Sequence, residues 1–209
     1  MKLLVLGATG LVGSHVLTLA LADRRISQVI APTRRPIPRR PKLLAHLVEF
    51  DRLPADAPWW SADAAVCALG TTMKKAGSRE AFRRVDHGYP LQAARLARRH
   101  GTPAFVLNSA MGANPRSPFF YNRVKGELER DLREVGFESL TFVRPGLISG
   151  QRGEFRLGER VAEVVLKAAG PALPRKWRVN PAGNIAAAML EAAVERKAGE
   201  RVVEAGGLA

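Results

Sequence analysis

The chain has 209 residues, which is enough for one domain with a substantial hydrophobic core. Its hydrophobic share of 46% and charged share of 25% are ordinary for a globular protein, whereas 33 Lys and Arg against 19 Asp and Glu give a formal net charge of +14. That charge favours contact with a polyanion, either nucleic acid or a phosphate-bearing cofactor. The one dense basic cluster, residues 34–42, has no interleaved Tyr or Phe, and no zinc-finger spacing is present, so the sequence does not favour direct nucleic-acid binding.

Cysteine and histidine usage excludes several kinds of site. Cys67 is the single cysteine, which excludes an intramolecular disulfide and indicates a reducing compartment, so we expect a cytoplasmic protein. Because Cys67 ends an apolar run, we interpret it as a small buried residue rather than a reactive thiol. The four histidines show no metal-ligand spacing, and we expect no metal site.

The N-terminal stretch superficially resembles a secretory signal, with Lys2 followed by apolar residues and Ala20-Leu21-Ala22. Glycines interrupt the apolar stretch in the middle, so we interpret it as part of the mature fold. No apolar run is long enough for a membrane span, and we expect no membrane partner.

Apolar runs and helical patterns alternate along the chain. We expect strands over residues 3–6, 28–31, 45–50, 64–69, 104–108, 139–143 and 201–204. We expect helices over residues 11–22, 79–99 with a bend near Gly88 and Pro90, 120–134, 158–168 and 183–196, and a loop or short helix over 52–61. This order predicts an α/β fold with a single Rossmann-type, doubly wound parallel sheet of about six or seven strands and helices on both faces.

The first expected strand runs into a turn with glycines at positions 7, 10 and 13, and an apolar helical pattern follows at once. In a dinucleotide-binding turn, Gly7 would allow the tight turn, Gly10 would let the backbone approach a pyrophosphate, and Gly13 would let the helix pack closely on the strand. The helix would direct its N-terminal N–H groups at the phosphates. The spacing differs by one position from G-x-G-x-x-G, and a purely structural turn is the alternative.

Polar residues and glycines fall at the carboxyl ends of the expected strands, where open parallel sheets bind their ligands. After the second strand comes Thr33-Arg34-Arg35, with no acid nearby to accept from the ribose of NAD. A guanidinium suits the 2′-phosphate of NADP through paired charge-assisted hydrogen bonds, so NADP is favoured over NAD. The alternative is that Arg34 and Arg35 are solvated loop charges.

Tyr121 and Lys125 are spaced to share one face of an expected helix. An ammonium close to a phenol lowers the phenol's pKa and allows it to transfer a proton, and the lysine can also hold the nicotinamide ribose. Tyr-x-x-x-Lys alone is usually a surface pair. Ser109, at the end of the fifth expected strand, strengthens the functional interpretation because its hydroxyl could hold a substrate carbonyl beside the tyrosine.

As a set, these motifs resemble the short-chain dehydrogenase/reductase superfamily. More narrowly, they resemble its atypical group that includes the Tat-interacting-protein-like oxidoreductases, on the motifs Cys67-Ala-Leu-Gly-Thr-Thr72, Val85-Asp86, Ser109-x-x-Gly112-Ala113, Tyr121-x-x-x-Lys125-Gly-Glu-Leu-Glu129 and Phe142-Val-Arg-Pro-Gly146. The match covers residues 1 to about 150, and the rest of the chain matches only loosely.

The resemblance implies a role for each matched residue. The glycine turn would hold the pyrophosphate and the two arginines the 2′-phosphate. Asp51 and its neighbour would flank the adenine, and the other residues would line the riboses and the nicotinamide. The implied cofactor-binding set is Gly7, Thr9, Gly10, Leu11, Val12, Gly13, Arg34, Arg35, Asp51, Leu69, Gly70, Thr71, Lys125, Pro145, Gly146 and Leu147.

The resemblance also implies that Tyr121 is the general acid, Lys125 its partner and Ser109 the carbonyl anchor. No asparagine can be assigned to the fourth catalytic role of longer family members. The whole chain, residues 1–209, is expected to form one domain, in which about 147–200 contribute a small C-terminal substrate lobe or lid.

The sequence therefore predicts an NADP(H)-dependent oxidoreductase that transfers hydride to or from a small carbonyl or alcohol substrate. The alternative is an NADP(H)-binding regulatory or partner-binding protein without turnover, since some atypical members keep the nucleotide for sensing. The Arg-rich outer face expected for helix 79–99 favours a monomer over a dimer. An apolar substrate pocket or ordinary core could be formed by Met111, Phe119, Phe120, Leu147 and Trp177.

Overall fold

The computed structural model describes residues 1–149 and 179–209. Its centre is a seven-stranded sheet in the order β3-β2-β1-β4-β5-β6-β9, and every pair of neighbouring strands is parallel. The strands are β1 (Lys2–Leu6), β2 (Gln28–Thr33), β3 (Leu43–Leu47), β4 (Ala64–Cys67), β5 (Ala104–Asn108), β6 (Ser139–Arg144) and β9 (Gly199–Glu204). The strand order reverses at β1, between β2 and β4, so the predicted doubly wound parallel sheet is confirmed.

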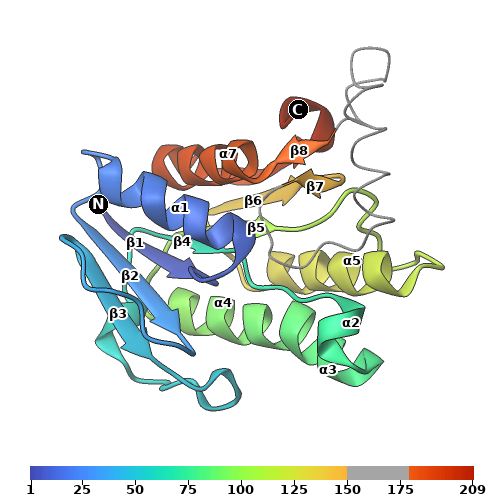
Figure 1. Ribbon diagram of the computed structural model, residues 1–209, viewed down its shortest axis with the longest axis horizontal. Helices are drawn as coiled ribbons and strands as arrows, with labels where there is room; N and C mark the ends of the chain where they lie inside the picture. Colours follow the sequence, from blue (N-terminus) through green and yellow to red (C-terminus); the bar gives the residue numbers. More distant parts are fainter. Residues whose placement is uncertain (150–178) are drawn as a thin grey trace.

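Helices cover both faces of the sheet (Figure 1). The helices α1 (Leu11–Ala22) and α7 (Ala182–Glu195) lie side by side on one face, and α4 (Tyr89–Arg99) and α5 (Phe120–Arg133) cover the other. Side chains alternate along each strand, so those of β1 divide between two cores. Leu3 and Val5 are buried with α1 and α7, whereas Leu4 and Leu6 are buried with α4 and α5. Because both faces are covered, the central strands read as continuous apolar runs.

Short elements connect these layers. They are the 3-10 turns η1 (Phe50–Arg52), η2 (Pro58–Trp60) and η5 (Ala205–Gly207), the helices α2 (Met73–Ala76) and α3 (Arg79–Arg83), the π-helical turn η3 (Arg84–Gly88), and a two-stranded sheet of β7 (Ile148–Ser149) and β8 (Asn180–Pro181). The helix expected over 79–99 is therefore the succession α3, η3 and α4. A π turn holds an extra residue, and this one brings the carboxylate of Asp86 inside the protein, where the residue is 1% exposed.

Two expected strands end earlier than predicted. The third strand covers 43–47 rather than 45–50, because the chain leaves the edge of the sheet and Phe50 begins the turn η1. The fourth strand ends at Cys67 rather than residue 69, because Ala68 and Leu69 pass over the glycine turn that follows β1. The last strand, β9, pairs with β6 and completes the sheet.

Several expectations fall on residues that the structure does not describe. The helix expected over 158–168, Trp177, and most of the expected lid region lie outside the described residues. Within 1–149 and 179–209, no helix has the length and apolar character needed to cross a membrane.

Candidate functional site

The turn between β1 and α1 brings three chain segments into close contact. Gly7 has φ +85°, and a Cβ there would lie 2.8 Å from the carbonyl carbon of Ala68. A Cβ on Gly13 would lie 2.0 Å from the carbonyl oxygen of Gly7. Both glycines are therefore required by sterics, and the N-terminus of α1 is held directly against the end of β1.

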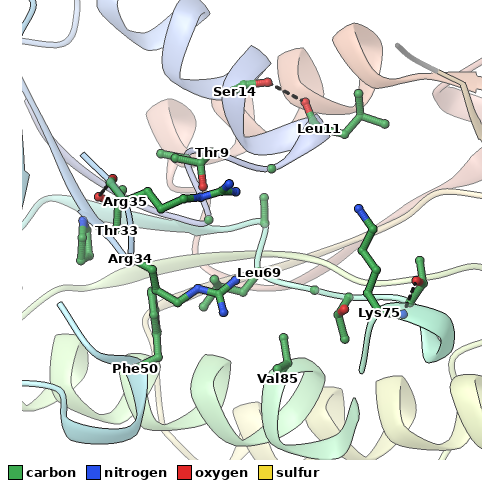
Figure 2. A pocket seen from close by; sticks show the side chains of 18 of the residues that line it. Thr9, Leu11, Ser14, Thr33, Arg34, Arg35, Phe50, Leu69, Lys75 and Val85 are labelled. Atoms are coloured by element: carbon green, nitrogen blue, oxygen red, sulfur yellow. Dashed lines mark hydrogen bonds between the residues drawn. The ribbon is translucent and has the colours of Figure 1, made fainter. Parts of the chain in front are cut away.

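A cavity of about 630 Å³ opens beyond this turn, at the carboxyl ends of β1, β2 and β4 (Figure 2). It lies at the point where the strand order reverses, which is where doubly wound sheets bind ligands. We call it the first cavity. Its lining includes Gly7, Ala8, Thr9, Gly10, Leu11, Ser14, Pro32, Thr33, Arg34, Arg35, Phe50, Leu69, Gly70, Thr71, Thr72, Lys75 and Val85.

The two arginines after β2 both reach the first cavity. Figure 2 shows the guanidinium groups of Arg34 and Arg35 extending into it from the same side, below and beside Thr9. The hydroxyl of Thr33, which is 4% exposed, donates to the carbonyl of Arg35 at 2.8 Å and fixes the backbone of this short segment. The expected pair of cations is thus positioned to bind an anionic group inside the cavity.

A second cavity of about 310 Å³ adjoins the first and reaches the ends of β5 and β6. The two cavities share Gly10, Leu11, Ala68, Leu69, Gly70, Thr71 and Thr72. The second cavity is further lined by Val12, Met73, Asp86, Asn108, Ser109, Tyr121, Lys125, Pro145, Gly146 and Ile148. The structure therefore brings Ser109, Tyr121 and Lys125 to one cavity, on the far side of the glycine turn from Arg34 and Arg35.

Lys125 is buried in an ion pair. Its Nζ lies 2.9 Å from Oδ1 of Asp86, and the other carboxylate oxygen of Asp86 accepts the backbone N–H of Thr71 at 2.7 Å. Burial is the largest single influence on Lys125 and would lower its pKa, but the charge and hydrogen bond of Asp86, together with the nearby Tyr121 and Cys67, outweigh it, and the pKa is raised above its ordinary value. Lys125 is therefore a permanent cation beside the second cavity.

Ser109 is also held by a buried acid. Its hydroxyl donates to Oε1 of Glu129 at 2.5 Å, and Arg144 binds the same carboxylate through two donors at 2.6 and 3.0 Å. Ser109 and Glu129 are 3% and 1% exposed. The single hydroxyl proton of Ser109 is thus directed at Glu129, which leaves only its lone pairs for a ligand in the second cavity.

Tyr121 stands in the first turn of α5 and is 41% exposed. Its ring lies 5.8 Å from that of Phe82, and Lys125 is one turn further along the same helix. Tyr121 is thus at the solvent-exposed rim of the second cavity, whereas Lys125 is at its buried wall.

Three of the expected site residues do not line either cavity. Gly13 acts in packing, as described above. The carboxylate of Asp51 accepts the Tyr89 hydroxyl at 2.8 Å, and its neighbour Phe50 lines the first cavity instead. Leu147 is 48% exposed, and Ile148 lines the second cavity in its place.

The structure also adds lining residues that sequence reasoning missed, above all Asp86, Asn108 and Lys75. Asp86 belongs to the Val85-Asp86 motif of the resemblance, which assigned it no role in the site, and only the π turn makes it face inward. Asn108 precedes Ser109, and its Oδ1 is buried without a hydrogen-bond partner among residues 1–149 and 179–209, so it offers an acceptor to a polar ligand. Lys75 carried no sequence signal beyond its place after Gly70-Thr71-Thr72.

The cysteine and the possible metal ligands do not contribute a reactive group to the site in the described residues. Burial raises the pKa of the Cys67 thiol to about 12, so it is a core residue and not a nucleophile. Among residues 1–149 and 179–209, no group of three His, Cys, Asp or Glu side chains could hold a metal ion.

The reversed strand order, the glycine turn and the cavities beyond it define a Rossmann-type α/β protein. The same fold occurs in MoeE5 in complex with UDP-glucose and NAD, with a TM-score of 0.75 and 18% identity over 97% of this chain and 75% of that one. It also occurs in the Bordetella bronchiseptica enzyme WbmG in complex with NAD, with a TM-score of 0.70 and 14% identity over 99% and 73% of the two chains. At these identities the likeness establishes the fold alone, and it is the fold that the short-chain dehydrogenase/reductase resemblance implied.

Sequence similarity identifies the family. The chain is 37% identical over 175 residues to the mitochondrial protein FMP52 of Candida albicans, which covers 79% of this chain and 75% of the relative. It is 39% identical over 176 residues to the mitochondrial protein fmp52 of Aspergillus fumigatus, covering 79% and 74%. The chain belongs to the FMP52 family. No protein-family model matches it.

These relatives correct two expectations. The narrower resemblance to Tat-interacting-protein-like oxidoreductases is not supported, because the curated relatives are FMP52 proteins. The expectation of a cytoplasmic protein is wrong, because the relatives are named as mitochondrial. That expectation rested on a single cysteine, and cysteine usage cannot distinguish the cytosol from another reducing compartment.

Proposed function

We propose that this protein binds NADP(H) across the two adjoining cavities and acts as an oxidoreductase on a small carbonyl or alcohol substrate. One observation carries the proposal. The first cavity holds Arg34 and Arg35, the second holds Tyr121 and Lys125, and the two meet at the N-terminus of α1. A dinucleotide has the same order of groups, with an anionic adenosine end, a pyrophosphate and a reactive nicotinamide end.

The residues present fit such a cofactor. Gly7 and Gly13 hold the N-terminus of α1 against β1, so its N–H groups face the junction of the cavities. Arg34 and Arg35 would bind the 2′-phosphate, and Phe50, which is buried but lines the first cavity, would contact the adenine in place of Asp51. The buried Oδ1 of Asn108, which has no partner in the described part of the chain, would accept a hydrogen bond at the nicotinamide end.

The bound nicotinamide would supply or accept the hydride. Tyr121 would give the compensating proton to the carbonyl oxygen as it becomes an alcohol, and would recover it from solvent at the rim of the second cavity. Lys125 would favour the phenolate that remains, because Asp86 keeps its ammonium charged. The proposed roles of Tyr121 and Lys125 are those of a proton donor and its electrostatic partner.

Ser109 takes a different role from the one its position suggested. Its proton is directed at Glu129, so it would accept a hydrogen bond from the ligand rather than donate one to a carbonyl. The Tyr121 phenol would then be the main donor to the substrate carbonyl oxygen.

The orientation of the Ser109 hydroxyl favours a second candidate function. A site whose serine donates inward lacks one of two donors to a carbonyl, and this supports an NADP(H)-binding regulatory protein without turnover. In that case nucleotide occupancy would set a surface that a partner recognises. MoeE5, one of the proteins of this fold named above, has been solved with NAD and either UDP-glucose or UDP-glucuronic acid. Sugar nucleotides therefore belong in any substrate search.

A panel of aldehydes, ketones, alcohols and UDP-sugars, followed by the absorbance of NADPH, would separate the two candidates. Cofactor-dependent turnover of any member above the rate without protein supports the oxidoreductase. Nucleotide binding without turnover of any member, together with a partner captured only in the presence of NADPH, supports the regulatory protein.

We also propose that the chain acts as a monomer. Arg95 and Arg99 are exposed on the outer face of α4, where a symmetric contact between two copies would bring like charges together. Light scattering that gives the mass of two chains would contradict this proposal.

A further inference from the structure

The first cavity contains a third cation, Lys75, which the proposed cofactor contacts above do not use. It comes from α2, the single helical turn that follows β4, and it lies on the opposite side of the cavity from Arg34 and Arg35. In Figure 2 the Lys75 side chain rises across the cavity toward Leu11 at the N-terminus of α1.

The local structure fixes the position of the Lys75 backbone. The backbone N–H of Lys75 donates to the hydroxyl of Thr72 at 3.2 Å, and the turn is closed by Gly77 at φ +78°. Thr72 belongs to the segment that both cavities share. Lys75 is therefore anchored next to the junction of the cavities and not at the arginine end.

That junction is where the proposed cofactor would place its pyrophosphate. The N-terminus of α1 lies on one side of it, with Gly10 and Leu11 in both cavities. The ammonium of Lys75 faces this terminus from the other side. A pyrophosphate between them would accept hydrogen bonds from backbone N–H groups on one side and from a point charge on the other.

We propose that Lys75 binds the pyrophosphate of the dinucleotide and closes the site from the side opposite α1. This inference rests on the proposed function. It adds that the cations of the first cavity bind different phosphate groups of the cofactor. Arg34 and Arg35 would recognise the 2′-phosphate and so choose between NADP and NAD. Lys75 would bind the group that both nucleotides carry and so raise the affinity for both equally.

The test compares Lys75→Gln with Lys74→Gln, which removes the same charge from the same helical turn. Lys74 is exposed and lines neither cavity, so it controls for the general effect of a net charge of +14. We expect Lys75→Gln to weaken the binding of NADPH and the binding of NADH by the same factor. That factor should be about tenfold, because one charge-assisted hydrogen bond is lost. Lys74→Gln should change neither by more than about twofold.

Two fragments sharpen the test because each carries one of the two phosphate groups. ADP carries the diphosphate without a 2′-phosphate, and adenosine 2′-monophosphate carries the reverse. Lys75→Gln should weaken the binding of ADP alone, and Arg35→Ala should weaken the binding of adenosine 2′-monophosphate alone.

Three results would overturn the inference. A loss confined to NADPH would assign Lys75 to the 2′-phosphate, and a loss no larger than that of Lys74→Gln would assign it to neither group. In both cases nucleotide binding by the unaltered protein would leave the proposed function standing. If the unaltered protein binds neither NADPH nor NADH, the proposed function fails and the inference fails with it.

Discussion

The ammonium of Lys125 lies 2.9 Å from the carboxylate of Asp86, and the two side chains are only 4% and 1% exposed. The same carboxylate accepts the backbone N–H of Thr71 at 2.7 Å. This pair therefore ties α5 to the π turn η3 and to the segment after β4, which are three walls of the second cavity. Its strength determines both the stability of that region and the charge of Lys125.

Replacing Asp86 with Asn should destabilise the protein, because it leaves a buried lysine without its counter-charge. Breaking one partner of a buried ion pair costs about 3–5 kcal/mol. Urea unfolding of the wild type and the Asp86→Asn variant would measure the difference. The matched control is Glu80→Gln, whose carboxylate is 88% exposed and 3.7 Å from Arg84, and which should leave the unfolding midpoint unchanged.

The loss caused by Asp86→Asn should also depend on pH. In the wild type the pKa of Lys125 is raised in the folded state, so its stabilising effect is fully present below the ordinary lysine pKa of about 10.4 and is lost as the pH rises through the folded-state pKa. In the variant, burial without a counter-charge lowers that pKa, and the folded variant gains stability as the pH rises. The difference in unfolding free energy should therefore be smaller at pH 10.5 than at pH 7, and an equal or larger difference would show that the pair is not ionised.

The close contact at Gly13 predicts a steric defect. In Gly13→Ala the new Cβ would lie 2.0 Å from the carbonyl oxygen of Gly7, so α1 must move away from β1. We expect a loss of about 1–3 kcal/mol in unfolding free energy, together with weaker nucleotide binding, since the helix N-terminus shifts. Gly183→Ala is the control, because a Cβ there meets nothing within 4 Å in the first turn of α7 and should stabilise slightly. Equal stability of the two variants would contradict the packing account.

The proposed proton transfer predicts a separation of binding from chemistry at Tyr121. Because the phenol is 41% exposed and at the rim of the second cavity, Tyr121→Phe should fold normally and keep its NADPH affinity. Turnover of any substrate found in the panel should fall by about 10²–10⁴-fold, the usual contribution of a general acid. Full activity of Tyr121→Phe with a genuine substrate would exclude the tyrosine as the proton donor.

The strands, the glycine turn and the arginines after β2 could be predicted because their signals are local. Apolar runs alternating with helical patterns determine the parallel sheet, and Gly7 and Gly13 stand where the chain must turn and pack. Strand ends were less predictable. Leu47 is 69% exposed at the edge of the sheet, and an apolar residue at such an edge does not mark where the strand stops.

The acidic partners of the site could not be predicted, because they depend on contacts between distant elements. Asp86 faces inward only because η3 is a π turn, and Glu129 reaches Ser109 only because α5 packs across β5 and β6. Asp51 is the reverse case. Its place after the third strand suggested a ligand contact, but Tyr89 of α4 binds its carboxylate.

The most direct test of the account is a calorimetric titration of the protein with NADPH and NADH at moderate salt, repeated with Arg34→Ala/Arg35→Ala. We predict that NADPH binds more tightly than NADH, and that the double variant weakens NADPH by about tenfold or more while leaving NADH nearly unchanged. Equal affinities that the double variant does not alter would contradict a 2′-phosphate site at these arginines. Binding of neither nucleotide to the unaltered protein would contradict the central claim that the cavities beyond the glycine turn hold a dinucleotide.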